Sequence, residues 1–127
     1  MITRQSQFNV STTLDRLEAA LSEKGIKPLA RVDHAAAARA VDMELRPTQV
    51  LFFGNPRLGT PLMQCNQTAG LDLPMRVIAW EAEDGTTWLE YHSPQVMFEH
   101  LELAGVSEVI AKMTAVLSAL TEYAIKE

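Results

Sequence analysis

The chain has 127 residues, 47% of them hydrophobic and 21% charged, which is typical of one folded domain and disfavours long disordered segments. Its 16 acidic and 11 basic residues give a net charge of −5, and Lys and Arg are scattered singly along the chain. A nucleic-acid partner and an anionic membrane surface are therefore disfavoured, because both need clustered positive charge. We expect a single domain over residues 1–127.

The expected cellular compartment of the protein is inferred from three features that the sequence lacks. The first residues, 1–7, do not form the apolar stretch of a secretory signal, and no run of 18 apolar residues could span a bilayer. Cys65 has no second cysteine to pair with, which fits a reducing compartment. We expect a cytoplasmic protein.

The first part of the chain predicts two strands and two helices. A short strand around residues 7–10 precedes a helix capped by Ser11, Thr12 or Thr13 and ended by Gly25. Residues 26–33 then predict a strand, and Pro28 indicates an edge position because proline cannot donate to a ladder. An Ala-rich short helix over residues 35–42 follows. The buried stripe of the first helix is Leu14, Leu17 and Leu21.

The middle of the chain predicts a strand, a turn and a helix. Residues 49–53 form a continuous apolar run, typical of a strand covered on both faces. The turn Gly54–Pro61 follows, with Thr60 as N-cap and Pro61 at the first position of a helix that ends near residues 69–70.

A β-hairpin over residues 75–92 is the best-defined element. If Asp84-Gly85 is a two-residue turn, Trp80 pairs with Leu89. This register predicts a core face made of Ile78, Trp80, Ala82, Leu89 and Tyr91. The opposite face then carries Met75, Val77, Ala79 and Trp88 beside Glu81, Glu90 and His92.

Two helices complete the chain. The first runs from Pro94 to about Ala104 and stops at Gly105, and Ser107 caps a long final helix. Its buried stripe is Ile110, Met113, Leu117, Leu120 and Ala124. The element order β-α-β-α-β-α-β-β-α-α predicts an α+β fold, an antiparallel sheet flanked by helices.

Several segments resemble the domain of unknown function family 302. They are Asp33-His34-Ala35, residues 50–56, residues 59–64, Asp72-Leu73-Pro74 and Tyr91, and the resemblance extends from about Phe8 to Tyr123. It implies a small α+β protein of the TATA-binding-protein-like class that pairs as a homodimer. It implies no established activity.

The turn from Gly54 to Thr60 is the first candidate site. Its two glycines and the expected helix start at Thr60 would point backbone amides into a concavity, and Arg57 could bind a phosphate or carboxylate. The turn lacks the Gly-Lys-Ser/Thr of a P-loop. A rigid strand-to-helix connection explains the same residues, with Gly for backbone angles and Asn55 for the turn.

Two further residue types could carry chemistry. His34 continues the alternation of its strand, so it is either a buried neutral imidazole or a general base. Cys65 follows the apolar stripe of its helix, which favours a small buried side chain over a reactive thiolate. Glu90 and His92 are too few to indicate a metal site, and no cofactor is expected.

We therefore expect a small homodimeric binding or accessory module for a polar or anionic ligand. Its candidate site residues are His34, Gly54, Asn55, Arg57, Gly59, Thr60, Gln64 and Tyr91. The dimer is expected to form through the second hairpin face, around Trp88. Two alternatives remain open: an enzyme with His34 as base or Cys65 as nucleophile, and a structural subunit that only pairs with another protein.

Overall fold

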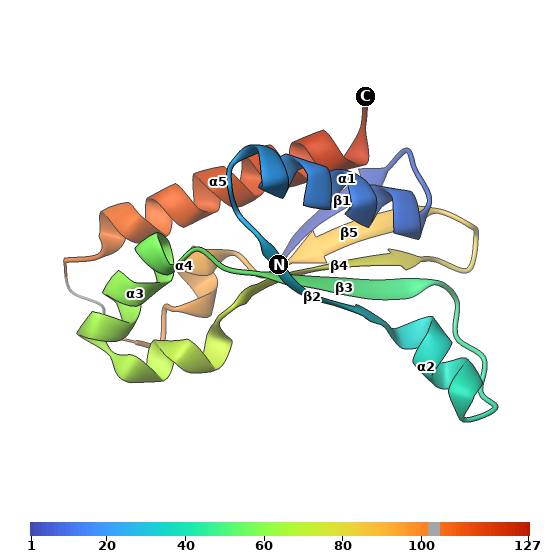
Figure 1. The fold of residues 1–127 in the computed structure, drawn as a ribbon, viewed down its shortest axis with the longest axis horizontal. Coiled ribbons are helices and arrows are strands. Elements are labelled where there is room, and N and C mark those ends of the chain that lie inside the picture. Colours follow the sequence, from blue (N-terminus) through green and yellow to red (C-terminus); the bar gives the residue numbers. More distant parts are fainter. Residues whose placement is uncertain (102–104) are drawn as a thin grey trace.

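A five-stranded antiparallel sheet organises the protein, in the strand order β1-β5-β4-β3-β2. The structure is a computed structural model and describes residues 1–101 and 105–127. Figure 1 shows α1 and α5 together on one face of the sheet, while α2 extends beyond the end of β2. The predicted α+β class and element order are confirmed. The elements are β1 (Ile2–Ser6), α1 (Val10–Glu23), β2 (Pro28–Asp33), α2 (His34–Ala40), β3 (Thr48–Phe53), α3 (Pro56–Cys65), the 3-10 helix η1 (Gln67–Asp72), β4 (Met75–Glu81), β5 (Thr87–Tyr91), α4 (Pro94–Met97) and α5 (Ser107–Ile125).

The N-terminal segment differs from the expected strand at residues 7–10. The strand is β1, earlier in the chain, and α1 begins at Val10 because Asn9 is the N-cap, its side chain accepting from Thr12 N at 2.7 Å. Asn is as good a cap as the three residues that were expected. Helix α1 ends at Glu23, and Gly25, with a left-handed φ of 71°, stops it as predicted.

The core lies between the sheet and the pair α1 and α5. Leu14, Leu17 and Leu21 of α1 are fully buried, as their spacing predicts. The stripe on α5 is buried at Met113, Leu117, Leu120 and Ala124, while Ile110 is only half-buried. Pro28 lies in an edge strand, as expected, because β2 ends the sheet.

The hairpin register is one residue away from the expected one. Ala82 N donates to Thr86 O at 2.8 Å and Gly85 has φ 87°, so the loop holds three residues, 83–85, instead of two. The pKa of Asp84 is lowered because its carboxylate accepts hydrogen bonds from Thr86. A shift of one residue moves every side chain of one strand to the other face.

The core face of the hairpin is therefore partly different from the prediction. Ala79 pairs with Leu89, and Trp80 pairs with Trp88. Leu89 and Tyr91 are buried as expected, but Ile78 and Trp80 point to the opposite face. In their place Met75, Val77 and Ala79 fill the core, at 8%, 0% and 0% exposure.

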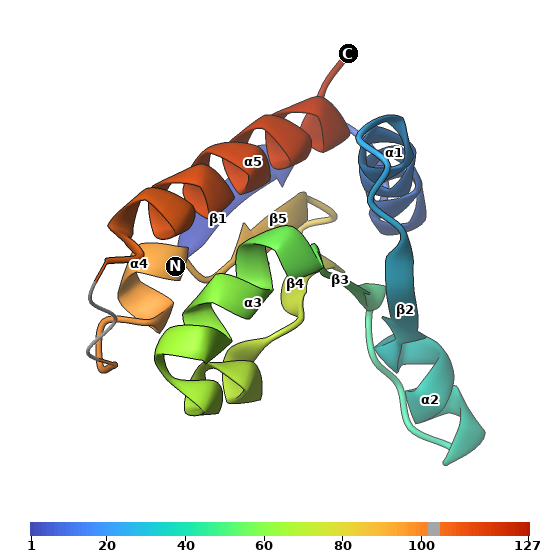
Figure 2. The same cartoon turned by 60° about the vertical axis from the view of Figure 1, so that its left-hand side comes forward.

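The segment after β5 also differs from the prediction. The short helix α4 stops at Met97, well before the expected end near Ala104, and residues 102–104 of that prediction lie outside the described part of the chain. In Figure 2, α4 lies near the N-terminal end of α5, and the two helices are in contact.

Candidate functional site

Helix α3 begins five residues earlier than the sequence suggested, at Pro56 instead of Pro61. Asn55 is the N-cap, its side-chain oxygen accepting from Arg57 N at 3.1 Å, and Pro56 is the first helical residue. Thr60 and Pro61 lie inside the helix, so the prediction of Thr60 as N-cap is wrong. Asn-Pro and Thr-Pro are equivalent signals for the start of a helix, and α3 begins at the first of them.

The early start uses up the backbone amides that were expected to face a ligand. Pro56 has no N–H, and the amide of Arg57 is taken by the Asn55 side chain. Leu58 N and Gly59 N both donate to Asn55 O at 2.9 Å. Any anion at this place would therefore depend on side chains.

The two glycines of the turn, Gly54 and Gly59, are required neither by backbone angles nor by close packing. Neither Gly54 nor Gly59 is among the glycines with positive φ, so the expected need for glycine backbone angles is wrong at these positions. A Cβ at Gly59 would lie 3.4 Å from Leu73 Cδ1, and one at Gly54 would lie 3.6 Å from Pro74 Cβ. Both are ordinary van der Waals distances, so a Cβ would fit at either position.

A hollow of about 730 Å³, which we call the α3 hollow, lies at this turn. Its walls are mainly apolar, and its charged lining residues in the described part of the chain are Lys24, Lys27 and Arg57, without a carboxylate. No described residue forms an ion pair with these three side chains. The lining consists of residues 24–27, 29, 53–60, 63, 70, 73–75, 113, 116 and 117.

The predicted site residues divide between two places. Gly54, Asn55, Arg57, Gly59 and Thr60 all line the α3 hollow. His34 and Tyr91 line a different hollow of about 700 Å³ on the sheet. Gln64 is exposed and lines neither of the two.

His34 is not the buried strand residue that was expected. It is exposed and is the first residue of α2, because Asp33 caps that helix by accepting from Ala36 N at 2.9 Å. Asp-His-Ala at the end of a strand is thus a helix start. Tyr91 is 6% exposed, on the core face as predicted.

Cys65 is exposed, so its predicted burial is wrong. Leu62 and Ala69 of the expected stripe are both fully buried. The stripe breaks at Cys65 because α3 ends there and Asn66 caps a separate 3-10 helix, which changes the helical phase. The thiol lines neither hollow.

The face of the sheet opposite α1 and α5 is also apolar. Cross-strand pairs place Val32 beside Val50, Val50 beside Ile78, and Trp80 beside Trp88. Among the residues predicted for an exposed hairpin patch, Trp88 lies here, whereas Met75, Val77 and Ala79 are buried. We call this surface the open face; it consists of Val32, Val50, Phe52, Ile78, Trp80 and Trp88, with Arg76 and Glu90 among them.

Polar groups on the open face are held by its aromatic residues. Trp80 Nε1 donates to Glu90 Oε1 at 3.1 Å. The Arg76 guanidinium lies 5.4 Å from the centroid of the Phe52 ring, within cation–π range. The sequence pattern missed Ile78 and Trp80 because the hairpin register was shifted. It missed Phe52 because the apolar run 49–53 indicated a strand covered on both faces.

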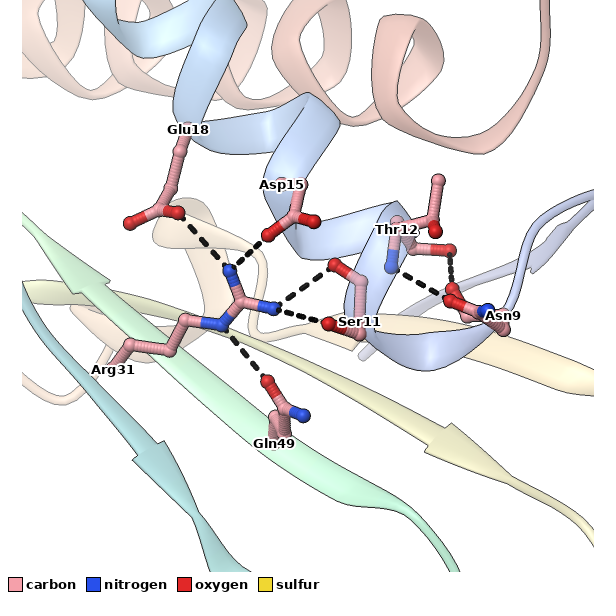
Figure 3. A network of polar contacts seen from close by, with 8 residues as sticks. Asn9, Ser11, Thr12, Asp15, Glu18, Arg31 and Gln49 are labelled. Carbon is pink, nitrogen blue, oxygen red and sulfur yellow. Dashed lines mark hydrogen bonds and ion pairs between the residues drawn. The ribbon is translucent and has the colours of Figure 1, made fainter.

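A polar network ties the edge strand β2 to α1, as Figure 3 shows. Arg31 Nη1 donates to Asp15 Oδ1 at 2.6 Å and to Glu18 Oε2 at 3.0 Å, and its Nε donates to Gln49 Oε1 at 2.8 Å. Its Nη2 reaches the backbone oxygen of Ser11 at 2.9 Å. This network holds in place the strand that leads from the α3 hollow to α2.

The described residues contain neither a cluster of metal-ligand side chains nor a helix suited to span a bilayer. Within residues 1–101 and 105–127, no three His, Cys, Asp or Glu side chains gather as metal ligands would. None of the described helices combines the length and apolarity needed to cross a bilayer.

Known proteins resemble the chain in sequence. It is 38% identical over 125 residues to a protein named fluoride-specific ion channel FluC 1 from Brucella suis, and the match covers 98% of this chain and 49% of that protein. A protein named fluoride-specific ion channel FluC 2 from Brucella melitensis matches at the same identity over 46% of its length. The chain thus spans about half the length of these relatives.

The fold has a close structural counterpart. A crystal structure of an uncharacterized conserved DUF302 protein from Bacillus stearothermophilus superposes with a TM-score of 0.87, covering 97% of this chain and 96% of that one at 19% identity. The family model for DUF302, a domain of unknown function, matches residues 2–120. Because that match spans nearly the whole chain, the protein belongs to the DUF302 family.

Proposed function

We propose that the domain is a binding module for a small organic anion, held in the α3 hollow. The observation that carries the proposal is the charge of the hollow's lining. Three of the chain's 11 basic residues line this one hollow, in a protein whose net charge is −5. A volume of about 730 Å³ is also in the usual range for small-molecule pockets.

The binding role has more support than the enzymatic alternatives. A general base or nucleophile must reach the reacting atoms, but His34 and Cys65 do not line the α3 hollow. His34 lines the hollow on the open face, while Cys65 is at the end of α3. Arg57, by contrast, lines the hollow and could bind a carboxylate with its planar fork.

Thermal shift with a panel of organic and inorganic anions tests the proposal. For Arg57→Ala we expect a free energy of unfolding within about 0.5 kcal/mol of wild type, because the side chain is exposed. The anions that stabilise the wild type should stabilise this variant less. Arg39→Ala on α2 is the matched control, since it removes the same charge away from the hollow. Equal responses in all three proteins, or no response at all, would remove the proposal.

We also propose that two copies pair through the open face. A sheet face that meets water normally carries polar residues, whereas this one carries two tryptophans, Phe52 and Ile78. It also holds charges of both signs, Arg76 and Glu90. A two-fold partner would bring the same charges and the same apolar patch, so the face is suited to a second copy of itself.

A second candidate function is that of an accessory domain to a fluoride-specific ion channel. It is favoured by the relatives, which are named fluoride-specific ion channels and match this chain over about half their length. The α3 hollow does not suit fluoride itself, since its apolar walls offer a small, strongly hydrated ion few donors. In this role the ligand of the α3 hollow would be an organic anion and not fluoride.

Fluoride tolerance of cells tests this second candidate. Cells that lack the chain should grow more slowly than complemented cells in medium containing sodium fluoride. Sodium chloride at the same concentration is the control for ionic strength. Equal growth of the two strains in fluoride would exclude the accessory role and leave the binding proposal untouched.

A further inference from the structure

We infer that the ligand of the α3 hollow is an amphiphile, an anionic head joined to a flexible apolar body such as an acyl chain. The inference rests on the proposed function and specifies the class of ligand. It follows from how the polar and apolar groups of the hollow are distributed.

The polar groups are too few to bind an inorganic anion. The first turn of α3 has no free amide to offer an anion. Pro56 has no N–H, and the amides of the next three residues all donate to Asn55. Exposed cationic side chains remain, namely Lys24, Lys27 and Arg57. An ion such as phosphate would give up hydration without a set of donors to replace it. A ligand held by these charges needs a second source of binding free energy.

The walls of the hollow supply that second source. Phe53, Met75, Met113 and Leu117, all buried core residues, form part of its lining. These residues come from β3, β4 and α5, so the hollow reaches the main core of the domain. Contact with these walls would remove the apolar body of the ligand from water. This transfer favours binding in proportion to the apolar area buried.

The methionines indicate that this body is flexible or variable in shape. Three of the chain's six methionines, Met63, Met75 and Met113, line the hollow. Methionine side chains are unbranched and polarizable, so they adapt to irregular surfaces. A peptide is a poor occupant, since its backbone N–H and C=O groups would meet walls with few hydrogen-bond partners.

Calorimetric titration with linear monocarboxylates tests the inference. From butanoate to decanoate, the Kd should fall by up to about fourfold for each added methylene until the hollow is filled. Octanoate should bind more tightly than octan-1-ol or octylammonium. Lys27→Gln should weaken octanoate binding, and Arg39→Gln, which removes a charge outside the hollow, should not.

A variant of the wall separates filling of the hollow from attraction by its charges. Thr60 is exposed and lines the hollow, so Thr60→Phe adds volume with little risk to folding. It should weaken decanoate binding more than butanoate binding.

The outcomes distinguish the two proposals. If acetate and phosphate bind as tightly as decanoate, the amphiphile inference is overturned while anion binding stands. If octan-1-ol binds as tightly as octanoate, the anionic head is wrong. If no anion binds the wild type, both proposals fail.

Discussion

Arg31 makes several hydrogen bonds that the local sequence pattern does not predict. It donates to Asp15, Glu18, Ser11 and Gln49, from two other elements. Its side chain is 21% exposed, and it lies in the edge strand, which has a sheet neighbour on one side only. In sequence it is one basic residue in an amphipathic strand, and its partners are defined only by the packing of α1 on the sheet.

Removing the Arg31 network should destabilise the domain measurably. For Arg31→Met we expect a loss of about 1–2 kcal/mol in the free energy of unfolding, since several partly exposed charged hydrogen bonds are lost together. Urea denaturation measures it. The loss should shrink at high salt, because exposed ion pairs are screened.

The matched control for Arg31→Met is Arg39→Met. Arg39 is exposed on α2, so its replacement should stay within about 0.5 kcal/mol of wild type. Equal losses in the two variants would mean that the Arg31 contacts contribute nothing net.

The burial of single residues could be predicted only where the sequence also determined which face of the helix they occupy. The stripes on α1 and α5 are long and regular, and their leucines are buried as their spacing indicates. Cys65 and His34 lie at helix ends, where a shift in the boundary changes the face that a residue occupies. Both are exposed although the pattern indicated burial.

At the scale of elements, type and order were predictable and boundaries were not. Hydrophobic periodicity identifies α1, β3 and α5, since it reflects which face is buried. The start of α3 could be read from two equivalent signals, Asn55-Pro56 and Thr60-Pro61, and local sequence does not choose between them. The choice of the first signal leaves Pro61 inside the helix and satisfies the amides that an anion would have used.

The hairpin shows the same limit with a larger consequence. Asp84-Gly85 fits both a two-residue loop and the observed three-residue loop with a left-handed glycine. The two loops differ by one residue in register. That difference decides whether Trp80 is a core residue or lies on the open face with Trp88.

The arrangement of the whole molecule was beyond local pattern. The α3 hollow joins segments around residues 24–29, 53–60, 63–75 and 113–117, which are brought together by the sheet order and by α5. The sequence identified the part of the lining within one segment, from Gly54 to Thr60. Lys24 and Lys27 flank a helix stop in the chain, and nothing in their neighbourhood indicates that they lie near Arg57.

The last prediction concerns pairing of two copies through the open face. Trp80 and Trp88 are cross-strand neighbours there, and a tryptophan buries roughly 200 Å². Light scattering at micromolar concentration should give the wild type twice the mass of one chain. Trp88→Glu should give a folded single chain. In a two-fold interface the substitution occurs in both copies, so two carboxylates would be buried against the apolar patch. The control Leu71→Glu changes a side chain that is 84% exposed on η1, and this variant should stay paired. Circular dichroism verifies that both variants are folded, and a wild type that is monomeric would contradict the pairing.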